Sequence, residues 1–434
     1  MNFLNKKKLF QIILFIFLFC TLWWLLSQIT CGDAGDKTVI EYAYWVGVPE
    51  EIEANRLIID AFHKENEDIK VIIRHHPWAD YFTKLYTGII TDTAPDVFRM
   101  SYAFLPDYVH YNSIQPLDDF FSDDTTLLKK DLVDWPFEAC VIDSQIMMLP
   151  FDCHVDILYY NKDMFDEASL AYPNTRWTWD DLLRSSIKLK EHFNNKGIND
   201  YTPLAGVSYS QFIMENGGKI LDRDRMVCTL NTPEAIGGLQ FLSDLIHKYH
   251  VALTPEAENS VVGGNPFIKE KCSMIYGGAY MMQAYISKAT FDWDITYRPR
   301  GKVWLAKNLS CGLSMNPNSR NKDAVWRLMK FFVSHKAQKI YSEVGAFVPI
   351  LKEIRDSKIF IPDDAVPEHK YLLLNVRDSH SQNWISRNWG RFRTTIGQEM
   401  DLMLEGKISP AEACKRAEMS GNRILDEVYG RNTQ

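Results

Sequence analysis

The chain has 434 residues, which is too long for one simple hydrophobic core and predicts two domains or lobes. Apolar residues make up 46% of it and charged residues 24%, which is typical of a folded protein and excludes an intrinsically disordered one. The formal net charge is -8 and no long basic run follows the N-terminus, so nucleic acid is not expected as the main partner.

Residues 1–31 form a distinct N-terminal segment. Three lysines, Lys6 to Lys8, precede an apolar stretch at residues 9–29, which is typical of an export signal, a membrane anchor or both. The stretch ends at Thr30-Cys31-Gly32, and a bacterial lipoprotein signal ends just before a cysteine that becomes lipidated. We therefore predict Cys31 as a lipidation site, with an uncleaved anchor or a cleaved secretory signal as alternatives.

Strands and helices are predicted to alternate in the next part of the chain. Residues 38–44 (TVIEYAY), 69–73 (IKVII) and 95–100 (PDVFRM) have the character of strands, and helices are predicted from residue 50 and over 81–90. The first helix is predicted to bury Ile52, Leu57, Ile58, Ala61 and Phe62. This order predicts a mainly parallel sheet flanked by helices, with ligands bound beyond the carboxyl ends of the strands.

The same alternation continues to the C-terminus. Residues 145–160 are predicted to be extended and residues 272–276 to form a strand, with a loop over 215–224. Helices are predicted over 179–193, with Thr178 as the N-cap, and over 232–249, 322–344 and 410–428. Both halves of the chain are therefore predicted to be α/β.

Cysteines follow no metal-binding or redox spacing. After Cys20 and Cys31, six are scattered through the chain and no C-x-x-C occurs, so both disulfides and buried free thiols stay open. The six are Cys140, Cys153, Cys228, Cys272, Cys311 and Cys414.

The stretch DCHVD, residues 152–156, carries three side chains that could ligate a metal ion: Asp152, His154 and Asp156. On a straight strand they share one face but span about 13 Å at roughly 3.3 Å per residue, too far for one ion. No H-x-H or H-E-x-x-H motif accompanies them. We therefore predict no metal and no cofactor, and expect Asp152 and His154 to face a cleft and contact a ligand.

Several stretches together resemble the extracellular solute-binding proteins of ABC importers, specifically the sugar-binding group related to maltose-binding protein. They occur in the family's order and cover nearly the whole chain after about residue 37. The stretches are AFHKENEDIKV (61–71), TAPDV (93–97), DILYYNKDMF (156–165), NTRWTWD (174–180), FIKEKCSMIYGGAY (267–280) and the helix at 322–338.

The resemblance implies a two-lobed periplasmic-binding-protein-like fold of type II, with a ligand cleft between the lobes. The first lobe would comprise residues 37–150 and 312–346, and the second residues 151–311 and 347–434. The chain would cross between the lobes near 149–156, 309–313 and 346–350. A monomer of this kind captures a carbohydrate outside the cytoplasmic membrane, performs no chemistry, and delivers it to an ABC permease.

The resemblance also implies site residues. Aromatic rings stack on sugar rings and polar groups bind hydroxyls. The predicted ligand-binding residues are Trp45, Glu50, Ser101, Asp152, His154, Tyr280, Trp389 and Arg391. Arg99, Tyr102, Trp78, Trp384 and Arg393 are further candidates, whereas Asp96 is predicted to support a loop.

Two other functions remain open. A glycoside hydrolase would need two opposed carboxylates, and no motif pairs them. A non-sugar binder of the same fold would take a phosphorylated polyol, a polyamine or a metal ion.

Overall fold

The computed structural model describes residues 37–431, apart from residues 48, 128, 223–225, 263, 306–307, 346–347 and 375–387 and the side chains of residues 154, 308 and 309. The predicted N-terminal segment, including Cys31, therefore lies outside the described residues. Within the described residues, no helix is both long enough and apolar enough to cross a membrane.

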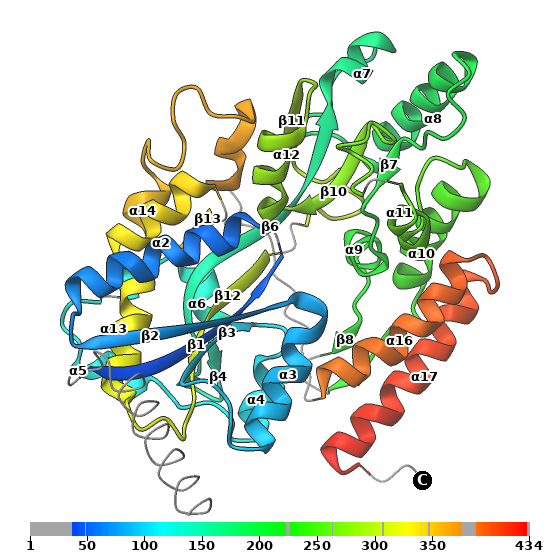
Figure 1. The fold of residues 1–434 in the computed structure, drawn as a ribbon. Coiled ribbons are helices and arrows are strands. Elements are labelled where there is room, and N and C mark those ends of the chain that lie inside the picture. The colour runs from blue at the N-terminus through cyan, green and yellow to red at the C-terminus, as the bar shows by residue number, and fades with distance from the viewer. Residues whose placement is uncertain are drawn as a thin grey trace, which may run out of the picture.

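A nine-stranded sheet runs through the molecule in the order β2-β1-β3-β12-β6-β10-β7, with β11 and β13 also paired to β6 (Figure 1). The predicted parallel start is confirmed, because β1 pairs in parallel with β2 and β3. The strands of this sheet are β1 (Thr38–Val46), β2 (Ile69–Pro77), β3 (Val97–Ser101), β6 (Leu149–Asn161), β7 (Leu204–Ala205), β10 (Met274–Gly278), β11 (Trp293–Thr296), β12 (Asn308–Met315) and β13 (Val348–Pro349).

One long strand, β6, belongs to both lobes. Its first part pairs with β12 and β13, and its second part pairs with β10 and β11. The β12 pairing slips by one residue, since Cys311 lies opposite Asp152 whereas Gly312 lies opposite Pro150. Phe151 is therefore an extra residue in the strand, a bulge of the kind that bends a strand.

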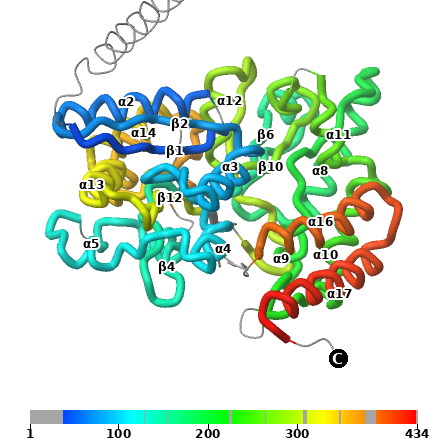
Figure 2. Tube along the Cα trace, turned by 60° about the horizontal axis from the view of Figure 1, so that its bottom comes forward, coloured from blue at the N-terminus to red at the C-terminus, as the bar shows by residue number. Residues whose placement is uncertain are grey.

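Helices cover both halves of the sheet (Figures 1 and 2). The first lobe carries α2 (Glu50–Glu65), α3 (Trp78–Ile90), α4 (Leu105–His110), α5 (Asp118–Asp123), α6 (Asp134–Glu138), α13 (Lys322–Phe332), α14 (His335–Val344) and α15 (Lys352–Arg355). The second carries α7 (Lys162–Glu167), α8 (Trp179–Asn195), α9 (Tyr209–Glu215), α10 (Pro233–Ser243), α11 (Pro255–Asn259), α12 (Met282–Lys288), α16 (Trp389–Leu404) and α17 (Pro410–Tyr429). Short 3-10 segments lie at Lys129–Asp131, Ala279–Met281 and Glu368–Leu374, and two-residue strand pairs at β4 (Val141–Ile142) with β5 (Gln145–Ile146) and β8 (Leu221–Asp222) with β9 (Val227–Cys228).

Three predicted elements need correction. The single helix predicted over 322–344 is two helices, because Ser334 caps a new one by accepting a hydrogen bond from the Ala337 N–H. The helix predicted over 232–249 is α10 followed by a π-helical turn at Asp244–Lys248. The loop predicted over 215–224 contains the short strand β8.

The buried face of α2 also differs from the prediction. Ile52 is 39% exposed, whereas Glu51 and Asn55 are buried with Ile58 and Phe62. Periodicity assigns a carboxylate to the solvent side, but here Glu51 meets a buried arginine, and Asn55 accepts a hydrogen bond from the Tyr42 hydroxyl at 3.0 Å.

Four hydrophobic cores fill the two lobes. In the first lobe one core lies beneath α2 and α13 and another beneath α3 and α4, and in the second lobe one lies beneath α8, α10 and α16 and another beneath α12. The six described cysteines are free and buried. They are distributed in pairs over three of these cores: Cys140 with Cys311, Cys153 with Cys272, and Cys228 with Cys414. This two-lobed α/β architecture confirms the predicted fold class.

Candidate ligand site

The strand ends of the two lobes meet near the crossing strand β6. We call this region the interlobe edge; it comprises Trp45 and Ser101 in the first lobe and Asp156, Gly278 and Arg298 in the second. The lobes also touch where the Trp389 N–H, at the start of α16, donates to Asp107 Oδ1 of α4 at 3.2 Å. Figure 2 shows α4 and α16 side by side.

A buried arginine organises the first lobe's side of this edge. Arg99 is 1% exposed, and its guanidinium lies 2.9 Å from Asp152 Oδ2 and 3.4 Å from Glu51 Oε1. Burial lowers the pKa of Arg99, but the two carboxylates more than offset this, so its pKa is raised. Arg99 therefore stays charged and ties α2, β3 and β6 together.

This arrangement corrects the predicted orientation of Asp152. The residue is 1% exposed, and its second oxygen accepts the Cys311 N–H at 3.1 Å. The predicted alternation of faces did not anticipate an ion pair with a residue 53 positions away. For His154 the structure describes only the backbone, which pairs with Leu309.

Glu50, the predicted carboxylate at the start of α2, is half-buried. Its Oε2 is buried, and no residue in the described ranges forms a hydrogen bond with it. Its neighbour Glu51, which the sequence reasoning missed, is the one that pairs with Arg99 and accepts the Gly47 N–H at 2.7 Å.

The predicted stacking tryptophans are both packed. Trp45 is 5% exposed and lies among Trp78, Tyr81 and Phe82, with the Arg99 guanidinium 4.1 Å from its ring centre. Trp389 is 4% exposed and packs on Phe392. In this conformation neither ring presents an open face, so their roles as ligand residues stay predictions.

Tyr280, unlike the predicted residues Trp45 and Trp389, has an accessible ring and is 38% exposed. It follows β10 at the interlobe edge. Burial raises the pKa of Tyr280 to about 12, helped by the negative charges of Asp156, Glu258 and Glu51. Because Glu51 belongs to the first lobe, charges from both lobes act on Tyr280.

Arg391 points elsewhere. It pairs with Glu427 of α17 at 2.6 Å, and both side chains are about half exposed, so it lies on a solvated helix face. Arg393 is the better placed arginine, because its charge acts on Tyr102 of the first lobe and Tyr209 of the second. Ser101 is buried, and its hydroxyl accepts the Ala103 N–H at 3.4 Å.

Two further candidates have clear positions. Asp96 supports its loop as predicted, since it accepts the Glu41 N–H at 2.9 Å and the Ser319 hydroxyl at 2.6 Å. Trp78 is 41% exposed at the rim of the aromatic cluster around Trp45. Trp384 lies outside the described residues.

A group of possible metal ligands in the described part of the chain lies away from DCHVD. It comprises Asp294, Glu368 and His369, whose ligand atoms lie within 4.8 Å of one another. His369 already contacts Asp294 twice, through Nδ1 at 2.5 Å and the backbone N–H at 3.0 Å. These two contacts explain the position of Asp294 without a metal ion, because they hold the Glu368–Leu374 segment against β11.

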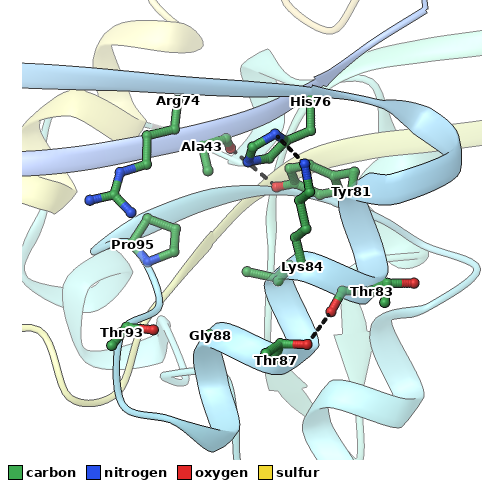
Figure 3. A pocket seen from close by; sticks show the side chains of 11 residues that line it. Ala43, Arg74, His76, Tyr81, Thr83, Lys84, Thr87, Gly88, Thr93 and Pro95 are labelled. Carbon is green, nitrogen blue, oxygen red and sulfur yellow. Dashed lines mark hydrogen bonds between the residues drawn. The ribbon is translucent and has the colours of Figure 1, made fainter.

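A separate cavity of about 300 Å³ lies in the first lobe, between β2 and α3 (Figure 3). The side chains of Arg74, His76 and Lys84 line it together with threonines, and the Lys84 ammonium lies 3.3 Å from His76 Nδ1. Arg74 pairs with Glu41 at 2.5 Å. The second lobe contributes no lining residue, so this cavity is distinct from the interlobe edge.

Known proteins share this fold. A family model described as bacterial extracellular solute-binding protein matches residues 49–339. A solved substrate-binding protein of Listeria monocytogenes, in complex with cycloalternan, superposes with a TM-score of 0.83 at 23% identity, covering 92% of this chain and all of that one.

Two curated relatives differ in their ligands. An arabinooligosaccharide-binding protein of Halalkalibacterium halodurans is 24% identical over 53% of this chain and 50% of its own length. An sn-glycerol-3-phosphate-binding periplasmic protein of Shigella dysenteriae is 20% identical over 91% of this chain and 94% of its own length.

Proposed function

Because the chain belongs to the bacterial extracellular solute-binding protein family, we propose that it captures a carbohydrate outside the cytoplasmic membrane and delivers it to an ABC permease. The observation that carries this proposal is Tyr280, an accessible ring at the interlobe edge, close to the carboxylates of Asp156 and Glu51. An aromatic face beside hydrogen-bonding groups is the form of a sugar site. The ligands of the Listeria and Halalkalibacterium relatives support the same choice.

Capture depends on lobe movement about the interlobe segments. A state with the lobes together contacts the ligand from both sides and is stabilised by it. The bulge at Phe151 of β6 and the contact between Asp107 and α16 provide a bending point and a meeting point. No covalent step is needed, and we assign none.

The finer arrangement is also a proposal. Attachment to the membrane through lipidated Cys31, a monomeric state and a permease partner follow from the resemblance of the sequence. For the lobes we propose residues 37–150 plus 312–346 and 151–311 plus 347–434. The pairing of β6 changes from β12 to β10 between Val155 and Asp156, which favours a first boundary a few residues later than 150. Ile350, which packs in the first lobe's core, likewise favours a later last boundary.

A second candidate is a phosphorylated polyol, as bound by the Shigella relative. Arg393 favours it, because its side chain is exposed, its charge acts on a tyrosine of each lobe, Tyr102 and Tyr209, and a guanidinium pairs well with a phosphate.

The test is a thermal-shift and calorimetric panel on the full chain in mild detergent. It includes arabino- and malto-oligosaccharides, cycloalternan, sn-glycerol-3-phosphate, spermidine and divalent ions. We expect a neutral saccharide to raise the melting temperature, because saturation at 100 times the dissociation constant stabilises by about 2.7 kcal/mol. Stabilisation by sn-glycerol-3-phosphate alone would favour the second candidate, and by a divalent ion alone would refute both.

A further inference from the structure

Arg298 lies at the interlobe edge of the second lobe, two residues beyond β11. Strand β11 pairs antiparallel with β6, Thr296 opposite Leu158, so continuing that register brings Arg298 beside Asp156. Asp156 is the residue of β6 that pairs with Gly278, two residues before Tyr280. Arg298 and Tyr280 thus follow the two strands that flank this part of β6, at one edge of the sheet, where ligands of such sheets bind.

The guanidinium of Arg298 is buried but incompletely paired. The residue is 3% exposed, and its Nε donates to Glu215 Oε1 at 2.6 Å. Its carbon centre lies 3.6 Å from the ring centre of Tyr276. Among the residues that the structure describes, none pairs with either terminal nitrogen, Nη1 or Nη2, or with the Tyr276 hydroxyl, and all three groups are buried.

Such groups are costly to leave unpaired. A buried donor without a partner destabilises the folded protein, and does so more when the donor is charged. Buried polar groups in proteins are rarely left without a partner, so each exception needs an explanation. Here three donor groups from two side chains meet in one place, which indicates a partner that is bound from outside the chain.

The charges around Arg298 select the chemistry of that partner. Glu215 is 1% exposed and also accepts the Trp179 Nε1–H at 3.1 Å, and the half-buried Asp156 accepts a hydrogen bond from Gln211. Two carboxylates therefore accompany one guanidinium, and a phosphate or carboxylate bound there would add a third negative charge. Sugar hydroxyls fit better, because each can accept from Arg298 and donate to a carboxylate.

We propose that Arg298, with Tyr276 and Asp156, forms a subsite that binds two adjacent hydroxyl groups of a neutral sugar. This inference rests on the proposed carbohydrate function and narrows it, since it excludes sugar acids and phosphorylated polyols from this subsite. The planar fork of an arginine presents two donors side by side, which matches the spacing of neighbouring hydroxyl oxygens.

The experiment measures calorimetric affinity of the full chain for the saccharide that binds in the panel. The variants are Arg298→Lys, which keeps the charge and loses the fork, and Tyr276→Phe, which removes only the unpaired hydroxyl. We expect affinity to fall about ten- to a hundred-fold for Arg298→Lys and about three- to ten-fold for Tyr276→Phe. Tyr276→Phe should keep or raise the melting temperature of the ligand-free protein, because no described residue pairs with that buried hydroxyl.

Two ligand analogues sharpen the test. A sugar that lacks one of the two hydroxyls cannot use both donors of the fork. The wild type and Arg298→Lys should therefore bind that sugar with similar affinity. The corresponding uronic acid should bind the wild type more weakly than the neutral sugar.

The outcomes separate the two proposals. Unchanged sugar affinity in both variants would overturn the subsite and leave the carbohydrate function standing. Tighter binding of the uronic acid than of the neutral sugar by the wild type would show an anion subsite and also overturn the inference. If the wild type binds no neutral saccharide of the panel, the proposed function is refuted, and the subsite with it.

Discussion

Each lobe contains a buried arginine near the interlobe edge, and the two differ in what surrounds them. Arg99 has Glu51 and Asp152 on two sides and the Trp45 ring against it. Arg298 has the Glu215 carboxylate on its Nε, and in the described part of the chain its two terminal nitrogens have no partner. The ion pairs of Arg99 hold α2, β3 and β6 together, whereas Arg298 has hydrogen-bond donors that a ligand can use. How well the protein itself pairs a buried guanidinium thus distinguishes a structural arginine from one that is available to a ligand.

The largest expected effect tests the structural member of this comparison. Replacing Arg99 by methionine leaves two buried carboxylates without their cation, so the free energy of unfolding should fall by about 3–5 kcal/mol. Urea denaturation followed by circular dichroism measures this. Arg56→Met is the matched control, because Arg56 pairs with Glu53 and Asp60 on an exposed helix face and should leave the midpoint unchanged. If Arg99→Met lowered the free energy of unfolding by less than about 1 kcal/mol, Arg99 would not be a structural arginine and would not differ from Arg298 in this way.

Arg298→Met should cost less, about 1–3 kcal/mol, because Glu215 keeps the Trp179 N–H as a partner. Burial already raises the pKa of Glu215, and without Arg298 that carboxyl group would protonate more readily. Adding Glu215→Gln to Arg298→Met should therefore recover most of the loss in the same urea experiment. A loss equal to that of Arg99→Met would mean that both arginines are structural.

Asp107 presents the reverse case, a carboxylate that meets a helix N-terminus of the other lobe instead of a cation. Burial raises the pKa of Asp107, while the N–H groups at the start of α16 lower it. Asp107→Ala should weaken the contact between the lobes by about 1 kcal/mol, shifting ligand-free protein roughly fivefold toward an open form. Small-angle scattering would detect a larger radius of gyration, and Asp107→Asn, which keeps an acceptor, should resemble the wild type. Equal scattering of all three proteins would contradict this role.

The smallest effect concerns Lys370, which lies 4.4 Å from the Phe360 ring and has no ion pair in the described part of the chain. Burial lowers its pKa to about 8. Between pH 8 and about 10 the unfolded chain binds more protons at this site than the folded one, so stability should rise with pH there. Urea midpoints at pH 7.5, 8.5 and 9.5 should show this rise in the wild type and a smaller rise in Lys370→Met. Identical profiles would mean that an acid compensates the ammonium.

These residues also show what the sequence could predict. The parallel β-α-β start, the long strand β6 and the helix capped by Thr178 follow from local patterns, and the structure confirms them. Glu51 and Asp152 could not be recognised as buried, because their partner Arg99 is far away in sequence and burial of a charge is decided by that partner. The predicted burial of Ile52 was wrong for the same reason, because Glu51 occupies the buried position instead.

Arg298 was missed because no predicted element contained it. The stretch DWDIT, residues 292–296, mixes charges with apolar residues, and its short strand is recognised only through its pairing with β6. A signal was present nonetheless: the arginine comes directly after an alternating apolar run, where a strand would end. Tyr280 could be predicted as a candidate because the stretch that contains it resembles a family motif, whereas no such stretch contains Arg298.

The distribution of the cysteines has a practical consequence. Three of the four cores each hold two free thiols, and burial raises the pKa of these thiols, so alkylation requires the core around them to open. Timed alkylation followed by mass spectrometry would therefore read the opening of each core separately, from sulfur atoms that the chain already contains. The molecule thus carries native reporters that can show which lobe loosens first, and whether a bound solute slows one lobe or both.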